Sequence, residues 1–353
     1  MPIQEGSYVT GSVRLVRLLG RGGMGSVWVA HHESLDAEVA VKFVAQELAE
    51  RDPSLLERFR REAASSAKLK SPHAVKTFDH GVMKDGVPYI VMELLEGETL
   101  GARLAREGKL PPQQVAIVVT QVAHVLDEAH RLGVVHRDIK PDNIFLIAGG
   151  YELFVKVLDF GIAKQTTAAA ATVTDTGAIV GTPQYMSPEQ LLSTKSADYR
   201  ADLWSLAVLA YHALTGQVPF RGETLPSLSI EICGGRFMPP SRLVQGLSQS
   251  FDDWFDRALD PEPARRFDSV LKMAELFGRV ARGGELGNMD TVRTPPRISS
   301  SPLSARPTPV ESVPGGTLAS AAMDSEPPAA TPPEVGVEEA AVDSGVRSSV
   351  PEG

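Results

Sequence analysis

HRDIKPDN, residues 136–143, carries one histidine, two acids, two bases and one amide within eight positions. It follows VAIVVTQVAHVLDEAHRLG (115–133), whose apolar periodicity predicts a helix. So many charged groups add little to an apolar core, because buried charges are stable only when they are paired. The segment is therefore either a solvated surface turn or a set of groups held ready for a reaction.

Upstream, the glycine cluster LGRGGMGSV (19–27) places Gly20, Gly22 and Gly25 in a G-x-G-x-x-G spacing between two strand-like runs. Without side chains, the backbone N–H groups of such a loop can approach an anion closely. A glycine-rich hairpin is also a common turn, so this motif alone leaves both interpretations open. A dinucleotide-binding fold needs a helix after the glycines, whereas SVWVAHH (26–32) has the pattern of a strand.

Two oppositely charged residues follow the glycine cluster. Lys42 ends the apolar alternation VAVK, and Glu62 lies within FRREA, in a segment with helical spacing. A solvated lysine at a strand end and a surface glutamate are the ordinary interpretations. Paired with each other, they would instead hold the ammonium as a fixed charge for phosphate oxygens.

Sixteen residues beyond Asn143, the segment VKVLDFG adds a second acid, Asp159. Further along lie GTPQYMSPE (181–189), RADLWSLAVLAYHALTG (200–216) and PARRF (263–267). Together with the glycine cluster and the H-R-D-x-x-x-x-N order of the opening segment, this set resembles the eukaryotic-like (Hanks-type) protein kinase family, in its bacterial serine/threonine members. A solvated turn does not account for all these motifs standing in kinase order.

The resemblance implies an α+β, bilobal protein kinase fold. A small, β-rich N-lobe (about 8–95) should contain strands within 10–45 and 76–95 and one main helix over 52–69. A larger, mostly helical C-lobe (about 96–280) should follow. Ligands favour the cleft between two such lobes.

The resemblance also implies how the charged residues act on ATP. Asp138 would accept or orient the proton of the substrate hydroxyl, and Lys140 would steady the γ-phosphate and mark a serine/threonine enzyme. Lys42, paired with Glu62, would contact the α- and β-phosphates. Asn143 and Asp159 would bind Mg²⁺, or Mn²⁺ in its place, because these ions favour oxygen ligands.

The residues assigned to the nucleotide base are apolar or belong to the hinge VMELLEG (91–97). They are Leu19, Val27, Ala40, Met92, Glu93, Leu95 and Phe145. The first three would form the ceiling of the pocket, Phe145 its floor and Met92 its back wall. The backbone of Glu93 and Leu95 would pair with adenine. Except for Glu93, all of them would serve equally well in an ordinary core.

Arg137 beside the expected base favours a phosphate partner, which kinases with this pairing draw from the loop between D-F-G and P-E. The loop offers Thr172, Thr174 and Thr176 for autophosphorylation, whereas Thr182 is expected to bond Asp138 and Lys140.

Two acids are expected to have structural roles in the C-lobe, and the first belongs to a buried pair. Glu189 would pair with Arg266, or with Arg265 because the spacing of PARRF is ambiguous. Asp202 would hold the backbone of the HRDIKPDN segment.

Composition limits the remaining function classes. The net charge of −9 and the lack of a basic face disfavour nucleic-acid binding. A single cysteine, Cys233, expected to be a buried thiol, suits a reducing cytoplasm, and no secretion signal or membrane segment is evident. The Pro/Ala/Ser/Glu-rich tail, 281–353, has no aromatic residue and is expected to be disordered.

Rival functions and partners stay open at this point. A pseudokinase-like scaffold that binds nucleotide without efficient transfer is disfavoured, because none of the transfer residues is missing. An aminoglycoside-type kinase usually lacks the threonine-bearing loop. Protein substrates follow from the resemblance, and homodimerisation is left open. Threonine–proline sites in the tail, such as Thr294 and Thr308, could recruit phosphothreonine-binding partners or lie in a spacer.

Overall fold

A computed structural model describes residues 3–22, 25–45, 68–149, 152–159, 183–192 and 197–286. Several expectations concern residues outside these ranges. They are most of the helix over 52–69, Glu62, Thr172, Thr174, Thr176, Thr182 and the tail from 287 onward.

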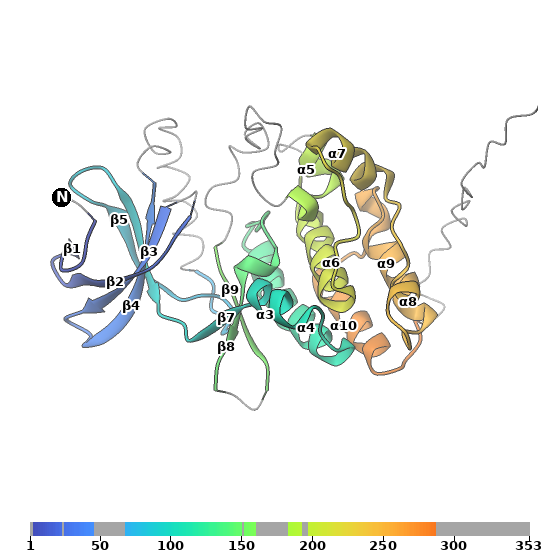
Figure 1. Ribbon diagram of the computed structural model, residues 1–353, viewed down its shortest axis with the longest axis horizontal. Coiled ribbons are helices and arrows are strands. Elements are labelled where there is room, and N and C mark those ends of the chain that lie inside the picture. Colours follow the sequence, from blue (N-terminus) through green and yellow to red (C-terminus); the bar gives the residue numbers. More distant parts are fainter. Residues whose placement is uncertain are drawn as a thin grey trace, which may run out of the picture. The chain divides into compact units, whose positions relative to one another are not determined.

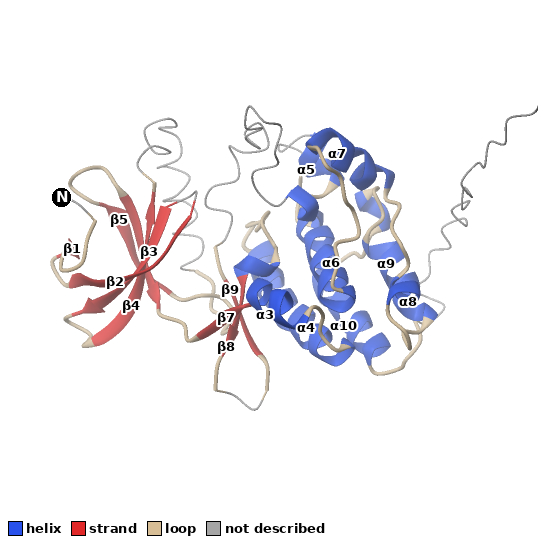
Figure 2. Ribbon diagram, viewed as in Figure 1, coloured by secondary structure: helices blue, strands red, loops and turns tan. Residues whose placement is uncertain are grey.

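The first part of the chain forms a six-stranded antiparallel sheet in the order β1-β2-β3-β4-β6-β5 (Figures 1 and 2). Its strands are β1 (Tyr8–Thr10), β2 (Val13–Gly22), β3 (Gly25–His32), β4 (Ala37–Val44), β5 (Thr77–Val82) and β6 (Pro88–Glu93). The strands expected within 10–45 and 76–95 are thus confirmed. Alternating apolar residues form them because β-branched and aromatic side chains suit a half-buried pleated surface.

The two faces of this sheet have different tasks. One face buries a cluster that includes Trp28, Val41 and Phe43. Because successive side chains of a strand point to opposite faces, Ala40 and Lys42 of β4 lie on the other face. The predicted phosphate-binding lysine therefore comes from the face that the sheet does not use for its own core.

A second, three-stranded antiparallel sheet was not predicted from the sequence. It consists of β7 (Gly97–Thr99), β8 (Ile144–Ile147) and β9 (Phe154–Val157) in that order. Strands of three or four residues carry too little alternation to be recognised. This sheet is essential to the site, because β8 follows Asn143 directly and β9 ends two residues before Asp159.

The larger lobe is helical, as expected (Figure 2). Its helices are α3 (Leu100–Glu107), α4 (Pro112–Arg131), α5 (Pro188–Leu192), α6 (Arg200–Thr215), α7 (Leu225–Gly234), α8 (Pro240–Leu243), α9 (Gln249–Ala258) and α10 (Val270–Ala281). Short 3₁₀ turns occur at Pro141–Asn143, Pro183–Tyr185 and Pro263–Arg265. Polar side chains fix the starts of some helices. The side chain of Thr99, for example, caps α3 by accepting the N–H of Ala102.

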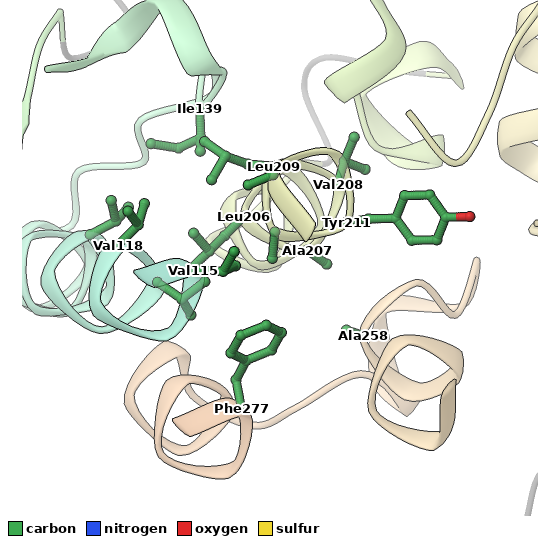
Figure 3. Packing of buried hydrophobic residues seen from close by; sticks show 14 of the residues in the cluster. Val115, Val118, Ile139, Leu206, Ala207, Val208, Leu209, Tyr211, Ala258 and Phe277 are labelled. Atoms are coloured by element: carbon green, nitrogen blue, oxygen red, sulfur yellow. The ribbon is translucent and has the colours of Figure 1, made fainter. Parts of the chain in front are cut away.

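The core of this lobe is built around α6, which is apolar on nearly all sides and buried. Figure 3 shows Leu206 and Leu209 of α6 among Val118 of α4 and Phe277 of α10. Ile139, the apolar residue inside HRDIKPDN, is fully buried in the same cluster. The charged segment is therefore anchored to the core by its own central side chain.

One segment links the two sheets. The N–H of Val157 donates to His73 O at 2.7 Å, and the N–H of Val75 donates to Val157 O at 3.0 Å. From α4, the two carboxylate oxygens of Glu128 accept the N–H groups of Lys70 and Ser71 at 2.8 and 2.9 Å. Residues 70–75 are thus fastened to the helical lobe before the chain returns to β5.

The expectation of a buried Cys233 is wrong, because its thiol is exposed. Helix α7 buries Leu228 and Ile232, which are one turn apart, and the next residue points away from that stripe. Among the helices of the described ranges, none is both long and apolar enough to cross a membrane.

Candidate active site

Asp202, at the start of α6, organises the HRDIKPDN segment as expected. Its fully buried carboxylate accepts the backbone N–H of His136 at 2.9 Å and of Arg137 at 2.7 Å. His130 Nε2 lies 2.8 Å from the same group. A buried carboxylate needs several such partners, so the position of the loop is closely specified.

The backbone around the two acids is strained. Arg137 has a φ of 62° and Asp159 a φ of 44°, a region that non-glycine residues rarely adopt. Such conformations persist only where the surroundings hold them, and they cluster at functional sites. His136 Nε2 lies 3.0 Å from Leu158 O, and the Leu158 N–H donates to Asn143 O at 2.8 Å. The two acid-bearing segments are therefore fixed to each other.

Asp138 lies at the centre of a small polar cluster. Its Oδ2 is 3.1 Å from Lys140 Nζ and accepts from Asn143 Nδ2 at 3.0 Å. The same amide nitrogen also donates to the backbone oxygen of Asp138 at 2.8 Å. A cation and an amide donor thus hold this carboxylate from two sides.

Lys42 of β4 and Asp159, which follows β9, form a second pair of charged residues. Lys42 Nζ lies 2.6 Å from Asp159 Oδ2, and the carboxylate is one-third exposed. The expected partner of Lys42, Glu62, lies outside the described residues. The structure therefore brings the predicted phosphate-binding lysine and one predicted metal ligand into direct contact.

The glycine cluster forms the hairpin between β2 and β3, with Gly22 paired to Gly25 and Gly20 paired to Val27. Gly25 has a φ of 139°, and a Cβ there would lie 1.9 Å from the backbone oxygen of Phe43. A Cβ at Gly20 or Gly22 would meet no atom within 4 Å. Gly25 is thus required for packing against β4, whereas the other two leave open space beside their backbone.

Gly25→Ala is expected to lower the stability of the protein by about 1–3 kcal/mol, the usual cost of a residue forced into a sparsely populated conformation. At roughly 2–4 °C per kcal/mol for a protein of this size, the melting temperature should fall clearly in a thermal scan. Gly22→Ala is the matched control and should change it little. Equal melting temperatures for the two variants would contradict the steric argument.

The residues predicted to surround the base come from both sheets. Ala40, which is buried, pairs in register with Met92, and Val27 pairs with Lys42. Residues paired in this way share a face, so these four lie together. Phe145 on β8 and Leu95 in the hinge after β6 are both partly buried. Leu19, on β2, is 45% exposed. Their assignment to adenine stays a prediction.

The side chain of Glu93 has a role that sequence reasoning missed. It accepts the N–H of Lys76 at 2.6 Å and pairs with Lys156 Nζ at 2.5 Å. Lys156 lies between Val155 and Val157 on β9, so its charge on an otherwise apolar strand was the available signal. The pair ties the hinge to the strand that leads to Asp159.

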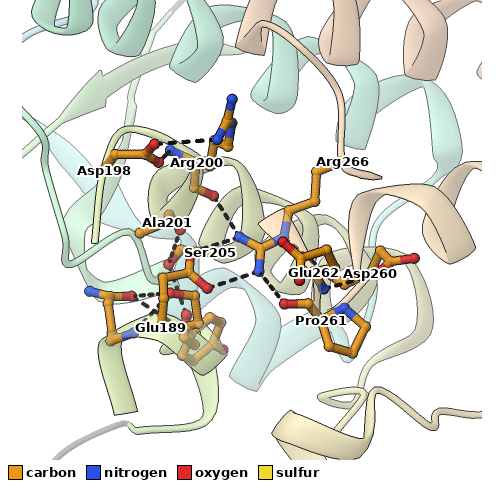
Figure 4. Close-up of polar contacts among 12 residues, drawn as sticks. Glu189, Asp198, Arg200, Ala201, Ser205, Asp260, Pro261, Glu262 and Arg266 are labelled. Atoms are coloured by element: carbon orange, nitrogen blue, oxygen red, sulfur yellow. Dashed lines mark hydrogen bonds and ion pairs between the residues drawn. The ribbon is translucent and has the colours of Figure 1, made fainter. Parts of the chain in front are cut away.

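The buried pair of the helical lobe involves Arg266 rather than Arg265, which is exposed (Figure 4). Arg266 binds both carboxylate oxygens of Glu189, at 2.8 and 2.9 Å. Burial alone would raise the pKa of Glu189, but the hydrogen bonds and charge of Arg266 outweigh it and hold that pKa below its usual value.

Comparison with known proteins agrees with this geometry. Residues 13–274 match the protein kinase domain family. The chain is 37% identical over 318 residues to the serine/threonine-protein kinase PknH of Mycobacterium tuberculosis, covering 90% of this chain and 49% of that protein. It is 39% identical over 269 residues to PknB of Mycobacterium leprae, covering 75% and 42%. The chain thus spans about half the length of the curated relatives it matches.

Among solved structures, the chain is similar to the crystal structure of the PknI kinase domain of Mycobacterium tuberculosis. The two share 29% sequence identity with a TM-score of 0.65, and the match covers 80% of this chain and 100% of that one. A second crystal structure of the same domain gives a TM-score of 0.63 at the same identity and covers 79% of this chain.

Proposed function

Because the chain belongs to the protein kinase family, in its bacterial serine/threonine (Hanks-type) branch, we propose that it transfers the γ-phosphoryl group of ATP to serine or threonine hydroxyls of proteins. The observation that carries the proposal is the convergence of Asp138, Asn143, Lys42 and Asp159. These residues come from separate stretches of the chain and form the contacts Asp138–Asn143 and Lys42–Asp159.

The chemistry follows from what each group can do. Phosphoryl transfer depends on in-line placement and on positive charge around the phosphate oxygens more than on covalent help from the protein. Asp138 accepts the proton of the incoming hydroxyl. Lys140, 3.1 Å from that carboxylate, is close enough to steady the γ-phosphate that the hydroxyl attacks. Lys42 contacts the α- and β-phosphates, with Glu62 as its expected support.

The residues also fit a divalent cation. Asn143 uses its amide nitrogen for both bonds to Asp138, which leaves the amide oxygen as a ligand, and Asp159 offers a partly exposed carboxylate. Such oxygen ligands suit Mg²⁺, with Mn²⁺ as an alternative. When bound with nucleotide, the ion neutralises charge on the phosphate oxygens.

Regulation and partners belong to the same proposal. Activation would follow autophosphorylation at Thr172, Thr174 or Thr176, with Arg137 as the partner of the new phosphate. Protein substrates and phosphothreonine-binding partners rest on the family resemblance, and a cytoplasmic location rests on the composition. The side chain of Arg137 supports its role as the partner of a loop phosphate, since its Nε is buried without a hydrogen-bond partner among the described residues.

The test is to incubate the purified chain with γ-labelled ATP, MgCl₂ and casein, and to map phosphate by mass spectrometry. We expect label on casein and on the loop threonines, and none after EDTA is added, because the transfer depends on the metal. Nucleotide binding without transfer to either acceptor would favour the scaffold interpretation. An active enzyme with an unmodified loop would refute the regulatory part alone.

A further inference from the structure

Gln190 on α5 is a buried polar residue to which the proposed mechanism gives no role. Its side-chain Nε2 donates to the backbone oxygen of Arg137 at 3.1 Å. That oxygen belongs to the peptide group that joins Arg137 to Asp138. One uncharged amide therefore connects the P-E segment, which closes the threonine-bearing loop, with the backbone of the expected catalytic base.

The orientation of this amide is fixed by chemistry. Its Oε1 accepts the backbone N–H of Ser187 at 3.0 Å and lies 3.2 Å from the hydroxyl of the same residue. An N–H can only donate and a carbonyl can only accept, so Ser187 and Arg137 are both satisfied in a single orientation of Gln190. The amide is thus held at one end by α5 itself and aims its NH₂ group at the catalytic loop.

The bond falls where the loop is strained. Arg137, at a φ of 62°, has its N–H held by Asp202 at 2.7 Å and its carbonyl held by Gln190. The N–H of Asp138 in turn lies 3.3 Å from His136 Nδ1. Both the carbonyl and the N–H of the peptide that joins Arg137 to Asp138 are therefore hydrogen-bonded. Gln190, which makes the first of these bonds, belongs to the P-E segment and not to the HRDIKPDN segment.

We propose that Gln190 is a positioning residue for phosphoryl transfer: from the P-E segment it sets the peptide plane between Arg137 and Asp138, and so the direction of the catalytic carboxylate. The inference rests on the proposed kinase function and deepens it. Its neighbour Glu189 anchors α5 to Arg266. Of these two adjacent residues, Glu189 therefore holds the segment in place and Gln190 orients the base.

Two substitutions separate this role from a merely structural one. Gln190→Glu keeps an oxygen for the Ser187 N–H but replaces the donor to Arg137 by a second oxygen. Gln190→Met removes the hydrogen bonds to Ser187 and to Arg137 while keeping a side chain of similar length. The matched control is Gln113→Met, because Gln113 Nε2 also donates to a backbone carbonyl, that of Ala281, at 3.3 Å but away from the site.

Steady-state kinetics with a protein acceptor and thermal melting decide the matter. We expect kcat to fall about tenfold to a hundredfold in both Gln190 variants, the scale of a small misplacement of a reacting group, with the KM for ATP changed less than about twofold. Gln113→Met should keep kcat. If Gln190→Glu matches wild type while Gln190→Met loses kcat and melting temperature together, Gln190 serves only α5 and the proposal is wrong.

The remaining outcomes are also decisive. An inactive wild type would refute the kinase function itself, whereas an active wild type with an unaffected Gln190→Glu would refute only the positioning role. Should neither variant fold, Gln190→Asn takes their place, because it keeps the amide but is one methylene too short to hold both Ser187 and Arg137. A lower kcat at unchanged KM for ATP then supports the proposal, and an unchanged kcat overturns it.

Discussion

Asp138→Asn is expected to lower kcat for phosphoryl transfer about 10²- to 10⁴-fold, the range that a positioned general base contributes. Asparagine keeps the shape of the side chain but cannot take up the proton of the acceptor hydroxyl. The carboxylate also neutralises Lys140, 3.1 Å away, so the substitution leaves this lysine without its anionic partner. Both effects act on the transfer step.

Nucleotide affinity should be nearly unchanged, because Asp138 is assigned no contact with the base or with the α- and β-phosphates. The measurement is kcat and KM for ATP at saturating Mg²⁺, with Asp253→Asn, an exposed acid of α9, as the control for a lost negative charge. Equal activity of wild type and Asp138→Asn would remove Asp138 from the mechanism. A raised KM with unchanged kcat would make it a binding residue instead.

Local contacts within the HRDIKPDN segment can be predicted from the sequence, because they depend on residue types at fixed local spacing. Asp138, Lys140 and Asn143 lie within six positions, and their mutual contacts follow from a single turn of chain. The alternation on β4 predicts equally directly that Lys42 leaves the face buried by Val41 and Phe43.

What the sequence does not predict depends on tertiary contacts between residues far apart. Gln190 and Arg137 are separated by 53 positions, and Lys156 and Glu93 by 63. Nothing local distinguishes a glutamine that orients a catalytic loop from one on a surface helix. Cys233 shows the opposite kind of error. Cysteine is usually buried, but this one lies one position after Ile232, the last buried residue of its helix, and is exposed.

Replacing either member of the Glu189–Arg266 pair should destabilise the helical lobe strongly. The Arg266 side chain is fully buried, and all five of its N–H donors are used. Nε donates to Asp260 O at 2.9 Å, Nη1 to Glu189 at 2.8 Å and Arg200 O at 3.0 Å, and Nη2 to Glu189 at 2.9 Å and Pro261 O at 3.3 Å (Figure 4).

The guanidinium also lies over the Trp204 ring, 4.9 Å from its centroid. Glu189→Gln would leave this cation buried without its counter-charge, and Arg266→Met would remove the counter-charge of the carboxylate and the donors to three backbone oxygens. Each should lower the free energy of unfolding by about 3–5 kcal/mol, the usual cost of breaking a buried pair. Arg266→Lys should restore little of the stability that Arg266→Met loses, since an ammonium cannot reproduce the five donors of a guanidinium.

The double variant Glu189→Leu/Arg266→Met should lose less stability than the sum of the single changes Glu189→Leu and Arg266→Met, because no unpaired charge remains in the protein interior. Urea unfolding measures the three losses of stability, and Arg279→Met, which removes an exposed pair with Glu275, should change the stability little. Losses that simply add would mean that the two side chains act independently, contrary to the bidentate geometry.

The pair should also set the response of the protein to acid. The pKa of Glu189 in the folded protein lies below its unfolded value of about 4.3, so its stabilising contribution is complete above that pH and is lost as the pH falls through the folded pKa. Wild type should therefore lose stability below about pH 4 more steeply than Glu189→Leu/Arg266→Met, which has no carboxylate there to protonate. Parallel curves for the two proteins would show that Glu189 does not titrate with unfolding, and that the attraction of Arg266 fails to outweigh the burial of its partner.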